Sequence, residues 1–307
     1  MIRNPIVVNE EPICVAPAGD RCGEGPVWDA AENALYWTDI NRFLIHRFDP
    51  QAGSVKSWFF DEPVTTIVLT NREHILAVAL GSRVILWNPA SDERAEQGFR
   101  LNGWPAVRLN DGRADPRGSL WLGSMRNNVT RDGCSLKAEG ADGILFRIDP
   151  DGSVSEWKTG IGISNTFAWS PDHARFCFAD TLANRVWAYE YDRTTGSISG
   201  ERILLDGFER GLPDGSAMDS EGYLWNCRYG GKCILRISPD GSVDQVIEMP
   251  VTNITNCTFG GHDYRTLYVT TASNGAPAEE RFSGGLFAFR THVPGQPENR
   301  FHLFTQQ

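Results

Sequence analysis

The chain has 307 residues, a formal net charge of −10, and a globular composition with 41% hydrophobic and 22% charged residues. Nucleic acids and anionic membrane surfaces bind clustered Lys and Arg, so the acidic balance excludes both as expected partners. The 31 glycines, 17 prolines and 10 tryptophans are typical of a β-rich fold with many turns.

The start of the chain and its cysteines predict a cytoplasmic protein. Residues 1–20 contain acidic residues and prolines where a secretory signal needs an uninterrupted apolar stretch. No segment reaches the ~20 apolar residues of a membrane span. The seven cysteines include no C-x-x-C pair, which favours reduced, buried thiols over zinc or redox chemistry.

One pattern returns six times along the chain: an apolar strand, a turn, and an aromatic or aliphatic strand. In chain order the copies are EGPVWDAAENALYWTD from Glu24, TTIVLTNREHILAVA from Thr65, NDGRADPRGSLWLGS from Asn110, NTFAWSPDHARFCFAD from Asn165, DGSAMDSEGYLWNCR from Asp214 and NCTFGGHDYRTLYVTT from Asn256. They begin roughly 40 to 55 residues apart, a spacing typical of one four-stranded propeller blade.

A second hairpin with an Asp-Pro or Asp-Gly turn follows several copies, as in ILFRIDPDGSVSEWKT, and predicts the two outer strands of each blade. A closed ring leaves only short, protected edges, whereas a solenoid would expose its ends. We therefore predict an all-β, six-bladed β-propeller with a central channel, one domain over residues 1–307. Residues 13–16 are expected to add the outer strand of the last blade, beside 284–293. Broad aromatic side chains at strand positions are expected to pack between blades: Trp28, Trp37, Trp121, Trp169, Trp225 and Phe259.

When the six copies are aligned, residues at the same position in each copy should lie at the same height and distance from the axis, and so form a ring. The type of residue at such a position therefore indicates what lines the channel. The residue four before Trp28, and its equivalents in the other copies, always carries a side-chain oxygen. These ring residues are Glu24, Thr65, Asn110, Asn165, Asp214 and Asn256. Asp and Asn also favour turns before strands, but that preference does not explain why all six copies carry a side-chain oxygen at the same position of the repeat.

Carboxylates brought together in a channel repel each other unless a cation compensates them, so the ring predicts one bound divalent metal ion. Oxygen ligands without His or Cys favour Ca²⁺, Mg²⁺ or Mn²⁺, and Fe²⁺ or Zn²⁺ also fit an open site. None of the six histidines lies in the ring column.

Several segments resemble the family of gluconolactonase, regucalcin (senescence marker protein 30) and luciferin-regenerating enzyme: Cys22-Gly-Glu24-Gly-Pro-Val-Trp28, Arg108-Leu-Asn110-Asp111-Gly112, Ser164-Asn165, Pro213-Asp214-Gly215 and Cys257-Thr-Phe-Gly-Gly261. The resemblance covers residues 14–273 and implies a six-bladed propeller of a group that includes sugar lactonases. It further implies that Glu24, Asn165 and Asp214 are the metal ligands, and that Arg108 and Asn110 face the substrate.

Animal members have an acidic residue after the Met of the third blade. Here Met125 is followed by Arg126, Asn127 and Asn128, and Asn127 is taken as the nearest match.

The expected reaction is metal-dependent opening of a sugar lactone, an aldono-1,4- or 1,5-lactone, to the aldonic acid. Three protein ligands leave positions open for water and the lactone carbonyl, as in a catalytic metal site. Asp214 is expected to be the general base, while Arg108 and Asn110 bond sugar hydroxyls or the developing oxyanion. No G-x-S-x-G elbow indicates a serine hydrolase.

Two alternatives remain beside the lactonase: a metal-dependent esterase or phosphotriesterase of the same fold, and a non-enzymatic calcium-binding propeller. An enzyme predicts an open coordination position and a polar pocket. A binding module predicts a saturated metal or a large exposed apolar patch. The protein is expected to be a monomer or a weak homo-oligomer.

Overall fold

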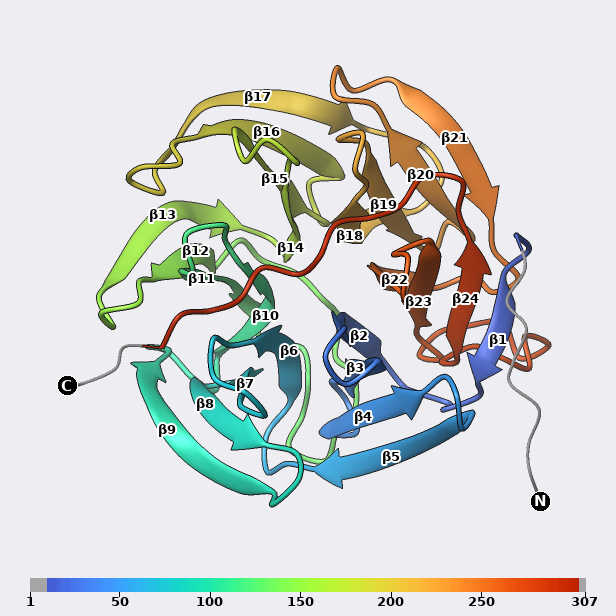
Figure 1. Cartoon of the computed structure of the whole chain (residues 1–307), viewed down its shortest axis with the longest axis horizontal. Helices are drawn as coiled ribbons and strands as arrows, with labels where there is room; N and C mark the ends of the chain where they lie inside the picture. Colours follow the sequence, from blue (N-terminus) through green and yellow to red (C-terminus); the bar gives the residue numbers. More distant parts are fainter. Residues whose placement is uncertain (1–9, 304–307) are drawn as a thin grey trace.

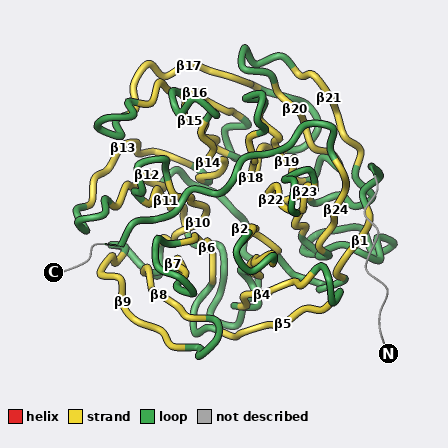
Figure 2. The backbone as a smooth tube through the Cα atoms, in the orientation of Figure 1, coloured by secondary structure: helices red, strands yellow, loops and turns green. Residues whose placement is uncertain are grey.

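The computed structural model describes residues 10–303, which form six antiparallel four-stranded sheets around a central axis (Figure 1). These residues contain strands and loops and no helix (Figure 2). An apolar helix long enough to cross a membrane is accordingly absent from the described part of the chain. The predicted all-β class and the six four-stranded blades are confirmed.

Each blade is a meander whose first strand lies nearest to the axis. The innermost strands are β2 (Gly23–Asp29), β6 (Val64–Leu69), β10 (Val107–Ala114), β14 (Ser164–Trp169), β18 (Leu212–Met218) and β22 (Ile254–Gly260). The second strands are β3 (Ala34–Asp39), β7 (Leu76–Leu80), β11 (Leu120–Arg126), β15 (Arg175–Asp180), β19 (Leu224–Tyr229) and β23 (Thr266–Thr271). The third strands are β4 (Leu44–Asp49), β8 (Arg83–Asn88), β12 (Gly143–Ile148), β16 (Arg185–Tyr191), β20 (Cys233–Ile237) and β24 (Leu286–Arg290). The outermost strands are β5 (Ser54–Phe59), β9 (Glu93–Arg100), β13 (Val154–Ile161), β17 (Ile198–Asp206), β21 (Val243–Glu248) and β1 (Ile13–Ala16).

The ring closes in the last blade, where the first strand of the chain pairs with the last strand. Strand β1 pairs antiparallel with β24, with Ile13 opposite Ala288 and Cys14 opposite Phe287. The N-terminal segment therefore completes the sheet built by the last three strands, as predicted. This pairing covers an edge that would otherwise be open.

The hydrophobic core is divided into clusters between neighbouring blades, because each sheet packs one face against the preceding blade and the other against the following blade. Trp28 and Trp37 pack between the first and last blades, and Trp121 and Trp169 pack between the third and fourth. Trp225 and Phe259 lie between the fifth and sixth. All six aromatic side chains predicted to pack between blades are buried there.

The last part of the described chain crosses one face of the propeller. We call residues 294–303 the C-terminal strap; it is the dark red segment in front of the ring in Figure 1. Ser220 N–H donates to the carbonyl of Pro294, and Phe301 N–H donates to the carbonyl of Leu69. Phe301 is buried against the cluster between the second and third blades. The strap thus ties distant blades together at the ends of their innermost strands.

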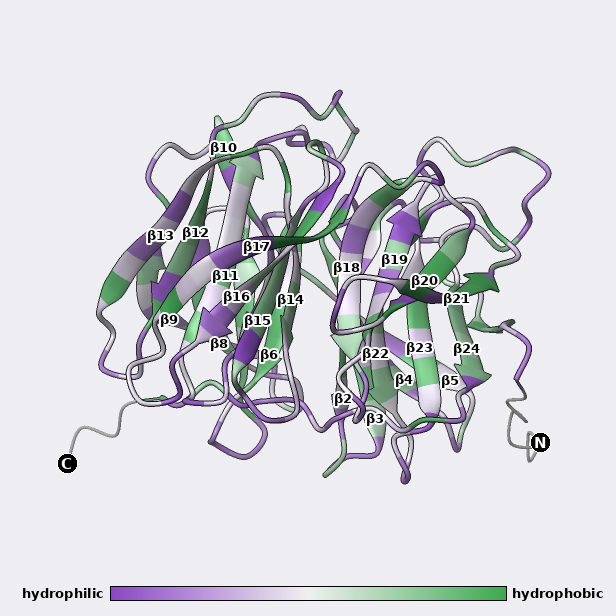
Figure 3. Ribbon diagram, turned by 90° about the horizontal axis from the view of Figure 1, so that it is seen from above, coloured by the Kyte–Doolittle hydropathy of each residue, from purple (hydrophilic) through white to green (hydrophobic). Residues whose placement is uncertain are grey.

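The strap gives the channel two different mouths. We call the end covered by the strap the lower mouth, and the end where the innermost strands begin the upper mouth. The side view shows the strands running between the two faces, with the connecting loops gathered at the faces (Figure 3).

Candidate metal and substrate site

All six ring residues are buried near the beginning of the innermost strands, at the upper mouth. A β-bulge coincides with the ring position in every blade, as in β2, where the register shifts between Glu24 and Val27. A bulge turns a side chain out of the alternation of a regular strand. The repeated bulge therefore places the ring side chains around the axis.

Four of the six ring residues line one cavity of about 400 Å³: Glu24, Asn110, Asn165 and Asp214. The other two do not line it. Thr65 donates its hydroxyl hydrogen bond to the carbonyl of Ala79. Asn256 donates from Nδ2 to Glu24 Oε2 at 2.9 Å, and so supports a neighbouring ring residue.

Hydrogen bonds determine which atom of Asn165 faces the cavity. Thr181 donates its hydroxyl to the carbonyl of Pro213 at 2.7 Å, so its oxygen accepts the 2.8 Å bond from Asn165 Nδ2. The Oδ1 atom of Asn165 is then directed to the other side, where Asn110 Nδ2 lies at 3.2 Å. Asn165 consequently offers an oxygen, not a nitrogen, toward the ring.

The two ring carboxyl groups lie in an environment that disfavours charge. Burial raises the pKa of Glu24 to about 7, and the charge of Asp111 adds to the effect. Burial, the charges of Glu24 and Asp111, and a hydrogen bond with Glu24 raise the pKa of Asp214 well above its usual range. Two buried carboxyls facing each other are stabilised either by shared protons or by a cation.

The donor set fits a hard divalent cation. The side chains of Glu24 and Asp214 and the Oδ1 atom of Asn165 offer oxygen atoms. Neither the Glu24 nor the Asp214 carboxyl has a cationic partner close enough to keep its pKa low. Residues 10–303 contain no cluster of three or more His, Cys, Asp and Glu side chains suited to a metal. A metal held here would therefore need an amide oxygen to complete its protein ligands.

Arg108 borders the same cavity and is 4% exposed. Its Nη1 donates to Asn110 Oδ1 at 2.7 Å, and its Nη2 donates to Asn128 Oδ1 at 2.7 Å. Burial lowers the pKa of Arg108 to about 10, although the charge of Glu24 opposes the shift. The guanidinium is thus held by two neutral amides and remains a cation at neutral pH.

The structure does not bring Asn127 into the cavity. Its Nδ2 donates to the carbonyl of Pro105 at 3.0 Å, and its Oδ1 accepts from Val129 N–H. Asn128, one residue further, lines the cavity and bonds Arg108 instead. Because β11 ends at Arg126, strand alternation stops there and cannot distinguish two adjacent asparagines. Asn128, and not the expected Asn127, therefore lines the cavity.

Sequence reasoning also missed one wall of the cavity. Residues 127–142 form the long loop between β11 and β12, and its Leu136 and Ser135 line the cavity. Ser135 Oγ accepts hydrogen bonds from Asn41 Nδ2 at 3.1 Å and Asn274 Nδ2 at 2.7 Å. The loop thus reaches from the third blade to residues of the first and last blades. Met125, Ile163 and Tyr229 add apolar surface. No periodic signal marks such residues, because they come from loops and strand ends.

Comparison with known proteins agrees with this architecture. The family model described as "SMP-30/Gluconolactonase/LRE-like region" matches residues 22–273. The chain belongs to this family. The matched region includes all four ring residues of the cavity and ends before the strap.

Two curated relatives and one solved structure illustrate the similarity. The 6-deoxy-6-sulfogluconolactonase of Pseudomonas putida is 36% identical over 305 residues, covering 96% of this chain and 99% of the relative. The pentonolactonase XacC of Haloferax volcanii is 35% identical over 293 residues, covering 91% and 94%. A solved structure of the calcium-binding protein regucalcin from Agrobacterium tumefaciens has a TM-score of 0.88 at 25% identity, covering 97% of this chain and all of that one.

Proposed function

We propose that this protein is a divalent-metal-dependent lactonase that opens an aldonolactone to the aldonic acid. The observation that carries the proposal is the pair of buried carboxyls, Glu24 and Asp214, beside the fixed amide oxygen of Asn165 in one cavity. The names of the two curated relatives, a pentonolactonase and a sulfogluconolactonase, favour sugar lactones over other esters.

Glu24, Asn165 and Asp214 would hold the cation. When bound, the cation would supply electrophilic stabilisation of negative charge on the lactone carbonyl oxygen. Asn110 holds Asn165 in place through its Nδ2 and is itself held by Arg108.

Asp214 would accept a proton from the attacking water as the new bond between water oxygen and carbonyl carbon forms. The ring C–O bond then breaks, and the departing ring oxygen takes the proton back from Asp214 to become a hydroxyl group. The cycle neither takes up nor releases a net proton; the carboxylic acid product then ionises and releases one proton to solution.

Arg108 and Asn128 would bind the polyol part of the substrate. The guanidinium has N–H donors, and amide side chains both donate and accept, as sugar hydroxyls require. With a cation and Arg108 in one pocket, and neutral amides in place of an acidic residue, we expect neutral aldonolactones with five- or six-membered rings to be preferred. The apolar wall from Met125, Ile163 and Leu136 would face the carbon skeleton.

The test is acid release from a panel of sugar lactones, followed with a pH indicator, with and without chelator. We expect hydrolysis that is abolished by chelation and restored by one or more of Ca²⁺, Mg²⁺, Mn²⁺, Zn²⁺ and Fe²⁺. Hydrolysis that survives complete chelation would overturn the metal requirement. Tight calcium binding with no hydrolysis of any lactone would favour a binding propeller instead.

A further inference from the structure

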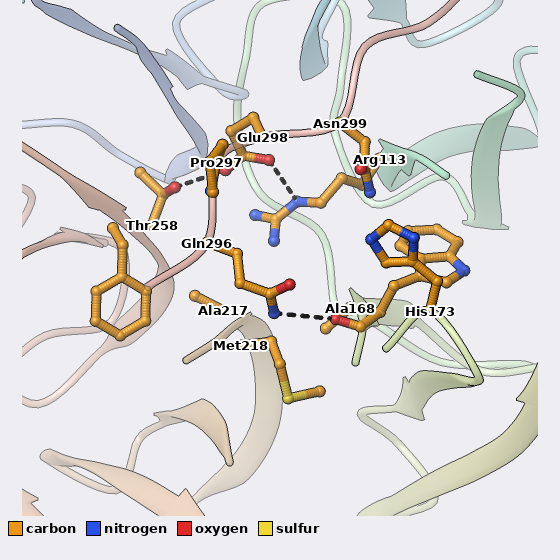
Figure 4. Close-up of a pocket in the computed structure, with 12 residues that line it drawn as sticks. Arg113, Ala168, His173, Ala217, Met218, Thr258, Gln296, Pro297, Glu298 and Asn299 are labelled. Carbon is orange, nitrogen blue, oxygen red and sulfur yellow. Dashed lines mark hydrogen bonds and ion pairs between the residues drawn. The ribbon is translucent and has the colours of Figure 1, made fainter. Parts of the chain in front are cut away.

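A second cavity lies at the lower mouth, at the opposite end of the innermost strands from the lactonase site. It has a volume of about 250 Å³ and is lined by residues of four blades and by strap residues 296–299 (Figure 4). Strand β10 links the two sites, with Asn110 at the upper one and Arg113 at the lower one. Three residues of strand separate them by roughly 10 Å.

The guanidinium group of Arg113 has protein partners on one side only. Its Nε lies 3.5 Å from Glu298 Oε2, and its Nη1 donates to the carbonyl of Ser216 at 3.2 Å. Glu298 also accepts a 2.7 Å bond from Thr258 Oγ1, which fixes the carboxylate. Figure 4 shows the terminal guanidinium nitrogens of Arg113 on the side of the cavity that Gln296 also borders. This leaves oriented donors without protein acceptors in the cavity.

Acceptors of the strap complement these donors. Gln296 Nε2 donates to the carbonyl oxygens of Trp169 and Asp219 at 3.3 and 3.4 Å, so its Oε1 is left to accept. Figure 4 shows the side-chain amide of Gln296 directed to the same space as Arg113. Asn299 likewise donates from Nδ2 to the carbonyl of Ala114 and keeps a spare acceptor.

The rest of the wall combines apolar side chains with the imidazole ring of His173. Met218 and the aromatic side chains of Trp169 and Phe259 line the cavity, and the charges of Arg113 and Glu298 cancel in their ion pair. An anion would approach Glu298 and a cation would approach Arg113, so neither is favoured over a neutral ligand. The volume lies below the range of about 300–1,000 Å³ typical of drug-sized ligands, which limits the ligand to a small molecule.

We propose that the lower cavity binds a neutral polyhydroxylated molecule of monosaccharide size. Hydroxyl groups both donate and accept, which matches the set of guanidinium donors and amide acceptors, and the C–H faces of a sugar suit the aromatic and methionine wall. Three of the polar lining residues, Gln296, Glu298 and Asn299, belong to the strap, which lies outside the matched residues 22–273. Binding at this site does not depend on the proposed lactonase reaction.

The experiment is isothermal titration of the whole protein with glucose, arabinose and sorbitol, in the presence of chelator. We expect saturable binding of at least one of them in the millimolar range. Arg113→Met and Gln296→Ala should each weaken it about tenfold, the loss expected for one good hydrogen bond to a charged group or one amide contact. The half-buried Gln296 side chain can be removed without opening the core, and thermal melting of both variants checks their folding.

Asp214→Asn distinguishes the two sites, because it alters only the upper one. Equal sugar affinity in Asp214→Asn and the unchanged protein is expected. Binding that is lost in Asp214→Asn but retained in Arg113→Met would overturn the proposal, as would the absence of saturable binding by all three probes or a preference for gluconate over every neutral probe. A protein without lactonase activity could still show the expected binding, so failure of one proposal does not decide the other.

Discussion

Asp214 lies near the start of the innermost strand β18 and Asp219 directly follows its end; both are buried carboxyls, and their surroundings differ completely. Asp219 Oδ1 accepts from the N–H groups of Glu221 and Tyr223, and Oδ2 accepts from Trp225 Nε1 at 3.0 Å. Arg236 adds an ion pair at 2.8 Å. Asp214 instead faces Glu24, and its pKa is raised.

The comparison separates a buried carboxyl whose charge has donors from one whose charge does not. At the lower end every oxygen of Asp219 has donors, as a buried charge in a stable fold requires. At the upper end no ion pair with Glu24 or Asp214 forms among the described residues, and the charge of the nearby Arg108 does not prevent the rise in the pKa of Glu24. A group left in this condition is a candidate for ligand binding or catalysis.

Replacing Asp214 by Asn should produce the largest change in activity. The amide still offers an oxygen to a cation, but it cannot accept the proton of water, so we expect kcat on a sugar lactone to fall by roughly 100-fold or more. Initial rates at saturating metal measure the effect. Activity within a few-fold of the unchanged protein would exclude Asp214 as the base.

Asp219→Asn is the matched change at the other end of the strand. It removes the ion pair with Arg236 and places an amide against the donor Trp225 Nε1, so we expect unfolding to become easier by about 3 kcal/mol. Activity per folded molecule should stay within about threefold. Urea unfolding and active-site-normalised rates provide the two readouts. A large loss of kcat with unchanged stability would reverse the assignment of roles.

The raised pKa values predict how pH affects the metal-free protein. The Glu24 carboxyl keeps its proton up to about pH 7 in the folded state, compared with 4.5 for the free group. Between these values the folded state binds more protons than the unfolded chain, so stability falls as pH rises. With chelator, the melting temperature should decrease from pH 5 to pH 8, and added divalent cation should reduce this decrease.

The double variant Glu24→Gln, Asp214→Asn is the control for this pH dependence. It lacks two of the three buried carboxyls whose pKa is raised at this site, so its melting temperature should be flatter over the same range. Asp111, whose pKa burial raises to about 6, still titrates in this variant. A metal-free protein that becomes more stable as pH rises would contradict the buried, proton-sharing pair.

The smallest expected effect distinguishes two adjacent asparagines. Asn128→Ala removes the acceptor of Arg108 Nη2 at the cavity wall, so we expect KM for the lactone to rise about fivefold to tenfold with little change in metal affinity. Asn127→Ala, outside the cavity, should change KM less than twofold. Steady-state kinetics and metal titration of both variants test this; a larger effect from Asn127 would restore the original expectation.

The sequence by itself determined the blades and the position of the ring. Each copy of the repeat carries its own strand, turn and aromatic residue, and these local patterns suffice to predict six blades, closure by residues 13–16, and oxygen-bearing side chains in one phase. Glu24, Asn165 and Asp214 could be selected as candidates for the same reason, and through the resemblance to the family.

Tertiary structure alone decided what each of these side chains contacts. Thr65 and Asn256 share the ring position, but Thr65 bonds the carbonyl of Ala79 and Asn256 bonds Glu24 from outside the cavity. Asn128 rather than Asn127 contacts Arg108. The strap and the loop 127–142 reach residues far away in the chain, which no periodicity within a blade encodes. Burial and hydrogen-bond partners are set by such distant neighbours, so the different chemistry of Asp214 and Asp219 could not be predicted from two Asp residues five positions apart in the sequence.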